Sequence, residues 1–117
     1  MKQTTISTEN TQSQMRKGVL ELCTLSALLG GEAYPTEIIE QLKNSKIMVV
    51  EGTLYPLLTR LKNAGYLTYR WEESTSGPPR KYYKLTPVGK QLLKELEITW
   101  DEMAEAVNKL LKQNKNK

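Results

Sequence analysis

Four cationic side chains that could neutralise phosphate lie close together in the middle of this 117-residue sequence. Arg80, Lys81 and Lys84 fall in one predicted strand, and Arg70 falls in the strand expected to pair with it. Lysine and arginine on such a strand pair neutralise the phosphates of a nucleic acid without reading its sequence. The alternative role is protection of an exposed strand edge, where lysine is common. The two roles are compatible, and we expect phosphate contact.

The distribution of charge favours a polyanionic partner. The net charge is +4, and residues 51–90 contain seven basic and three acidic residues, so this segment carries the whole excess. The segments before and after it are each neutral. A local basic block of this kind is typical of a surface that binds nucleic acid.

A predicted helix over about residues 51–64 offers a second surface for recognition. Its buried stripe follows the spacing of Leu54, Leu57, Leu58 and Leu61. Five candidate DNA-contacting residues fall on its other faces: Thr53, Tyr55, Pro56, Arg60 and Asn63. Hydroxyl groups and the planar guanidinium of Arg60 can meet phosphates or base edges. The alternative is an ordinary solvated face, with Arg60 paired to a carboxylate.

Proline inside that helix needs an explanation, because it costs about 3 kcal/mol in a helix interior. We expect either that the helix begins near Gly52 and Thr53, which places Pro56 in or near the first turn, or that it is kinked at Pro56.

The composition excludes several classes of catalytic and metal site. The sequence contains no histidine and a single cysteine, Cys23, so it has no Ser-His pair, no His metal site and no intrachain disulfide. Glu72-Glu73 and Asp101-Glu102 are adjacent in sequence and therefore diverge on a strand or helix. We expect no enzyme activity, no metal and no cofactor. Cys23 is expected to be a buried small apolar residue.

The remaining periodicities place the elements that must position these side chains. Helices are predicted from about Gln14 to the Gly30-Gly31 pair and from Pro35 to about Asn44, and residues 46–50 could form a brief extended segment. A hairpin follows, with strands at about 67–72 and 80–85 and a turn over 74–79. Tyr69, Trp71 and Tyr83 alternate with polar residues and are expected to pack the hairpin onto the helices.

Three helices followed by a two-stranded hairpin is the order of a winged helix-turn-helix. The predicted fold class is therefore mainly α with a small β-hairpin, completed by a long C-terminal helix from about Pro87 to Lys112 with Thr86 as its N-cap. We divide the chain into a flexible N-terminal extension (1–13), a DNA-binding domain (14–86) and a dimerisation helix with its tail (87–117). No signal peptide or membrane-spanning run is visible, so a cytoplasmic protein without a membrane partner is expected.

The C-terminal helix carries apolar residues at steps of 3, 4, 3, 4 and 3. This heptad seam, typical of a helix that pairs with a second copy, consists of Leu93, Leu96, Trp100, Met103, Val107 and Leu110. The alternative is that the helix folds back onto its own domain. In a dimer, Trp100 with Leu96 and Met103 could form an apolar slot for a planar aromatic effector, or Trp100 could simply fill the interface.

Two sequence motifs resemble the PadR family of transcriptional regulators. The first runs from Gly52-Thr53-Leu54-Tyr55-Pro56 to Gly65-Tyr66-Leu67, and the second runs from Gly77-Pro78-Pro79-Arg80 to Thr86, followed by Gly89. Tyr34 to Ile38 also resembles the start of the family's second helix, although Pro35 stands where many members carry glycine. The similarity covers about residues 15–112 and implies a homodimeric winged-helix repressor, relieved in many members by a small aromatic or drug-like effector.

We therefore expect a sequence-specific transcriptional regulator whose partners are double-stranded DNA with a pseudo-palindromic operator, a second copy of itself and a small aromatic effector. The alternative is a winged-helix module that binds another protein and not specific DNA. The salt dependence of binding discriminates the two, because bound phosphates release counterions.

Overall fold

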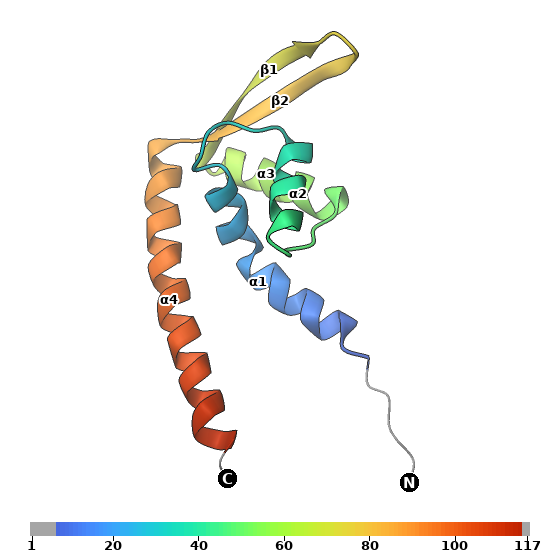
Figure 1. Ribbon diagram of the computed structural model, residues 1–117. Helices are drawn as coiled ribbons and strands as arrows, with labels where there is room; N and C mark the ends of the chain where they lie inside the picture. The colour runs from blue at the N-terminus through green and yellow to red at the C-terminus, as the bar shows by residue number, and fades with distance from the viewer. Residues whose placement is uncertain (1–6, 116–117) are drawn as a thin grey trace.

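The computed structural model describes residues 7–115 and contains the predicted succession of elements (Figure 1). These elements are α1 (Glu9–Ala27), α2 (Pro35–Asn44), α3 (Glu51–Asn63), β1 (Leu67–Ser74), β2 (Gly77–Leu85) and α4 (Pro87–Lys115). The first three helices form the body, the hairpin projects from one end of it, and α4 runs from that end back past α1 (Figure 1). The predicted fold class, a winged helix-turn-helix with a long C-terminal helix, is confirmed.

The core lies between the three helices and the base of the hairpin. Leu25, Ile38, Leu54, Leu58 and Leu61 have no exposed surface, and the predicted leucine stripe of α3 is buried throughout. Burying a leucine or isoleucine side chain contributes about 1.5–3 kcal/mol relative to leaving it exposed. This stripe fixes which faces of α3 remain available for a partner.

Helix α1 begins earlier than expected. It starts at Glu9, five residues before the predicted Gln14, and ends at Ala27 ahead of the Gly30-Gly31 pair. The added turn is polar and exposed, so it has no apolar periodicity, and Glu9 stands in the first turn where a carboxylate favours the helix dipole. Residues 1–6 of the expected flexible extension lie outside the described residues.

Helix α3 begins at Glu51, so Pro56 lies inside the helix and not in its first turn. Because proline has no N–H group, the carbonyl of Gly52 receives no hydrogen bond from position 56. Both residues are exposed, and water can reach that carbonyl. The linker before α3 forms no strand: Lys46 has a φ of 65°, residues 47–50 belong to no strand, and Val50 at the N-cap is extended.

The hairpin is longer and its turn tighter than predicted. Ser74 pairs with Gly77, so Gly77-Pro78-Pro79 belong to β2 and not to the turn. The strands pair antiparallel, and a bulge between Glu72 and Ser74 absorbs the difference in length. We call residues 67–85 the wing. Its base is fixed to the body by two backbone hydrogen bonds, from Ala33 to Tyr83 at 3.0 Å and from Tyr83 to Ala33 at 2.9 Å.

Helix α4 begins as predicted and extends three residues beyond Lys112. The Thr86 hydroxyl accepts a hydrogen bond from the Gly89 N–H at 3.0 Å, which is the expected N-cap contact. Within residues 7–115, no helix combines the length and apolar character needed to cross a membrane.

Candidate nucleic-acid interface

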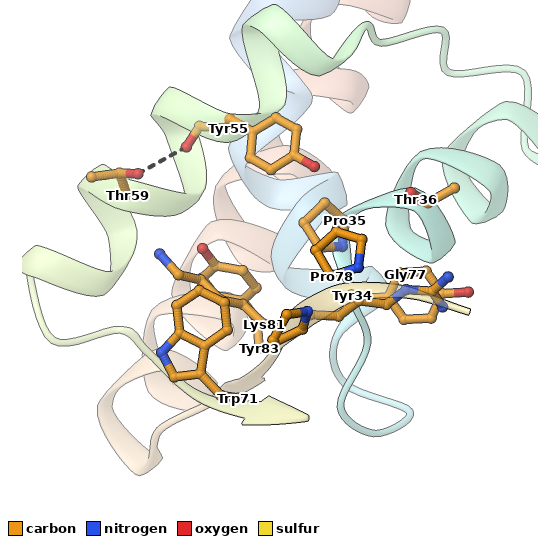
Figure 2. Close-up of a pocket in the computed structure, with 12 residues that line it drawn as sticks. Tyr34, Pro35, Thr36, Tyr55, Thr59, Trp71, Gly77, Pro78, Lys81 and Tyr83 are labelled. Atoms are coloured by element: carbon orange, nitrogen blue, oxygen red, sulfur yellow. Dashed lines mark hydrogen bonds between the residues drawn. The ribbon is translucent and has the colours of Figure 1, made fainter. Parts of the chain in front are cut away.

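A groove of about 480 Å³ lies where the wing, the start of α2 and the outer side of α3 meet (Figure 2). We call it the wing groove. The body contributes Tyr34, Pro35, Thr36, Tyr55 and Thr59, and the wing contributes Trp71, Gly77, Pro78, Pro79, Arg80, Lys81 and Tyr83. The groove therefore combines aromatic surface, hydroxyl groups and two of the predicted cations.

The wing register separates the four predicted cations into two groups. Arg70 pairs with Tyr82, and Thr68 pairs with Lys84, which places Arg70, Arg80 and Lys84 on one face of the strand pair. Lys81 lies on the other face, with its Nζ 4.6 Å from the ring centre of Tyr69 and 5.2 Å from that of Trp71. Three of the four predicted cations therefore share one face of the wing, and Lys81 is separated from them.

Arg70 is held by a carboxylate. Its Nε donates hydrogen bonds to both carboxylate oxygens of Glu32, at 3.0 and 3.1 Å, and its Nη2 lies 3.4 Å from Glu72. The hydrogen bonds from Arg70 lower the pKa of Glu32, and the hydrogen bond to Glu32 raises the pKa of Arg70. Arg70 is therefore largely engaged within the protein, unlike Arg80 and Lys84, which form no ion pair among the described residues.

Arg80 is ordered by an aromatic ring. Its guanidinium carbon stands 4.5 Å from the ring centre of Tyr34, at the start of α2. A cation–π contact of this kind uses no N–H group of the guanidinium, so these donors remain available to a phosphate.

The candidate residues of α3 point in two directions. Tyr55, with 45% of its surface exposed, faces the wing groove together with Thr59, whose hydroxyl donates to the Tyr55 carbonyl at 3.1 Å (Figure 2). Thr53 borders a separate hollow beside α1, and Arg60 forms an ion pair with Glu21 of α1 at 3.6 Å while remaining 61% exposed. Pro56 and Asn63 are exposed.

Several groove residues were not predicted from the sequence. Tyr34 and Thr36 enter the groove because they flank Pro35 at the start of α2, and Thr59 enters because it follows Tyr55 by one helical turn. Trp71 was expected to pack the wing onto the helices, but it is 60% exposed and borders the groove. It lies two residues farther from the base of the wing than Tyr69 and faces the open groove. The packing role is confirmed for Tyr83, which is 4% exposed, and for the half-buried Tyr69.

The predicted seam of α4 is divided between the core and solvent. Leu93 is buried and Leu96 is half-buried against the body of the same chain, so part of the helix does fold back on its own domain. The other four members, Trp100, Met103, Val107 and Leu110, are between 45% and 60% exposed. Leu96, Trp100 and Met103 line one hollow of about 100 Å³ between α1 and α4.

The side chain of Cys23, on α1, is half-buried and borders a hollow that α2 and α4 also line. We expected this side chain to be buried. Burial raises the pKa of its thiol, which disfavours the reactive thiolate. Among the described residues, no three His, Cys, Asp or Glu side chains are grouped so that they could hold a metal ion.

Comparison with known proteins matches residues 24–95 to the model of the transcriptional regulator PadR-like family. A PadR-like transcription factor from Bacteroides fragilis is 57% identical, with a TM-score of 0.72 over 86% of this chain and 98% of that one. A PadR family regulator from Eggerthella lenta is 35% identical, with a TM-score of 0.83 over 91% and 93%. Bacillus subtilis PadR, solved in complex with operator DNA, is 29% identical, with a TM-score of 0.64 over 68% of this chain and 47% of that one.

Proposed function

Because this chain belongs to the PadR-like family of transcriptional regulators, we propose that it binds a specific operator through the wing groove and the exposed side of α3. The family consists of DNA-binding regulators and not enzymes, which agrees with the expectation drawn from the sequence. The observation that carries the proposal is the position of Arg80 and Lys81 on the groove wall opposite Tyr55. Bacillus subtilis PadR, a relative of this chain, binds operator DNA.

In this proposal, α3 enters the major groove and the wing lies along the adjacent backbone. Tyr55 reads base edges from the groove side of α3, and Thr53, Pro56, Arg60 and Asn63 extend the contact toward α1. Arg80, Lys81 and Lys84 neutralise phosphates, so they contribute affinity on every sequence.

We propose a homodimer that joins through α4. The apolar side chains of Trp100, Met103, Val107 and Leu110 are between 45% and 60% exposed in the single chain, and such an exposed stripe is unfavourable in water. Leu93 and Leu96, the first two members of the predicted seam, contribute at its edge. Two-fold symmetry gives a pseudo-palindromic operator with half-sites about 34 Å apart.

We also propose a repressor released by a planar aromatic effector that binds beside Leu96, Trp100 and Met103. The hollow at these residues measures about 100 Å³ in the single chain. Ligand pockets usually measure about 300–1,000 Å³. The second copy must therefore complete the site, and an effector that binds there can favour one spacing of the two α3 helices over another. A regulator of this kind acts on the chromosome, so its proposed location is the cytoplasm.

The experiment that tests DNA binding is a gel shift with the DNA upstream of the protein's own gene. We expect a discrete complex that persists in the presence of excess unrelated duplex and dissociates as the salt concentration rises. A winged-helix module that binds only other proteins forms no such complex, and this result would contradict the proposal.

A further inference from the structure

One ion pair joins the wing to the turn that follows α1. Glu32 lies in that turn and receives two hydrogen bonds from the Nε of Arg70 on β1, at 3.0 and 3.1 Å, as well as one from Nη2. The residues are 38 positions apart in sequence, so the contact is tertiary. Glu32 is next to Ala33, whose backbone bridges to Tyr83 of β2, and the side-chain and backbone contacts therefore act on the same junction.

The ion pair is continuous with a stack of rings that reaches the wing groove. The guanidinium of Arg70 lies 4.9 Å from the ring centre of Tyr82, and Tyr82 meets the edge of Tyr34 at a centroid distance of 5.2 Å. Tyr34 in turn carries the guanidinium of Arg80, at 4.5 Å. A continuous series of contacts therefore links Arg70, through two rings, to a cation that borders the groove.

We propose that Glu32 and Arg70 are positioning residues, which hold the wing at a fixed angle to α2 and α3 and thereby set DNA affinity without contacting DNA. The effect on DNA rests on the proposed function, but the contact between Glu32 and Arg70, which we call the clamp, can be observed without DNA. It assigns Arg70 a role different from that of Arg80 and Lys84, although all three lie on one face of the wing.

A phosphate contact by Arg70 and a positioning role predict opposite effects of removing Glu32. If Arg70 binds phosphate, Glu32 competes for it, and Glu32→Gln strengthens DNA binding. If the pair positions the wing, Glu32→Gln and Arg70→Gln weaken binding alike, because either change releases the same contact. The salt dependence separates the two cases, since only the loss of a phosphate contact reduces its slope.

The test measures affinity for a fluorescein-labelled duplex from upstream of the gene across a series of KCl concentrations. The proteins are the parent, Glu32→Gln, Arg70→Gln and the double variant. Each variant should bind about threefold to tenfold more weakly with an unchanged salt slope, and the double variant should be no weaker than either single one. Lys84→Gln is the matched control, because it removes a cation from the same face of the wing and should reduce the slope by about one.

Amide hydrogen exchange without DNA provides the second readout. The amides of Ala33 and Tyr83, which form the bridge at the base of the wing, should exchange faster in Glu32→Gln and Arg70→Gln, while those of α3 keep the parent rates. Unchanged exchange at the bridge overturns the clamp. Faster exchange with unchanged DNA affinity, or tighter binding by Glu32→Gln, overturns the positioning role. If the parent itself fails to bind DNA, the proposed function is wrong, and the exchange rates still decide whether the clamp exists.

Discussion

Gly89, in the first turn of α4, lies directly against the backbone carbonyl of Tyr66, and a Cβ atom at position 89 would overlap that oxygen. The same junction is tied by two hydrogen bonds: the Thr86 N–H donates to the Tyr66 carbonyl at 3.1 Å, and the Thr86 hydroxyl donates to the Gly65 carbonyl at 2.7 Å. This close approach fixes where α4 leaves the domain, and hence where a second copy would be placed.

Gly89→Ala should therefore destabilise the protein. The neighbour is backbone and cannot move aside as the end of a side chain could, so we expect a loss of about 1–3 kcal/mol in the free energy of unfolding. Thermal unfolding followed by circular dichroism measures it. Gly52→Ala is the control, because a Cβ there meets nothing within 4 Å and alanine favours a helix. Equal melting temperatures for Gly89→Ala and the parent would contradict the close-packed junction.

The fold was predictable because each element has a local signal. Pro35 marks the start of α2, Thr86-Pro87 marks the start of α4, and the leucine spacing of α3 marks its buried side. The first turn of α1 was missed because residues 9–13 are polar and lie on no apolar stripe.

The site was only partly predictable, because the direction of a side chain depends on tertiary contacts. Sequence placed Arg70 beside Arg80 and Lys84, but nothing near Arg70 in sequence indicates Glu32, which lies 38 residues away. For Arg60, the sequence indicates that a carboxylate could pair with it but not which one. Its partner Glu21 lies on α1, and the local sequence does not indicate that α1 and α3 approach each other there. Trp71 alternates with polar residues as a packing residue would, but its side chain borders the open wing groove and is 60% exposed.

The ion pair between Glu32 and Arg70 predicts a specific dependence of stability on pH. Hydrogen bonds from Arg70, aided by the charges of Arg70 and Lys84, lower the pKa of Glu32 in the folded protein. A group of this kind stabilises the fold above its unfolded pKa, and the contribution is lost as pH falls through the lower folded pKa.

Between about pH 5 and about pH 3, the melting temperature of the parent should therefore fall more steeply than that of Glu32→Gln. Glu40→Gln, which removes an exposed carboxylate from α2 that forms no ion pair among the described residues, should keep the slope of the parent. Parallel curves of melting temperature against pH for the parent and Glu32→Gln would show that the ion pair does not stabilise the protein in solution.

Met103→Lys should prevent dimerisation. Met103 is 56% exposed in the single chain, so lysine is tolerated there in a monomer. In a paired seam, an unpartnered charge costs several kcal/mol. Sedimentation velocity should show a dimer for the parent, a monomer for Met103→Lys and Leu110→Lys, and a dimer for Glu102→Lys on the flank of the helix. Deletion of residues 98–117 spares the core residue Leu93. A tight dimer after this deletion would show that the seam does not hold the two copies together.

Tryptophan fluorescence should locate the effector. Trp100 borders the hollow between α1 and α4, and Trp71 borders the wing groove. A planar aromatic probe such as acridine should quench the parent and Trp71→Phe but leave Trp100→Phe unchanged. Quenching that persists in Trp100→Phe and disappears in Trp71→Phe places the probe in the wing groove and contradicts the proposed effector site.

The most direct test of the whole account is the salt dependence of operator affinity, measured by fluorescence anisotropy on the operator and on scrambled duplexes of the same length. We predict a steep linear fall of log affinity with log salt on both duplexes, with tighter binding to the operator. Arg80→Ala and Lys84→Ala should weaken binding to both and reduce the slope by about one each, whereas Tyr55→Ala or Thr53→Ala should reduce the preference for the operator. Equal affinity for the operator and the scrambled DNA would contradict sequence recognition by α3. An affinity that does not change with salt or with either wing substitution would contradict phosphate contact by the wing.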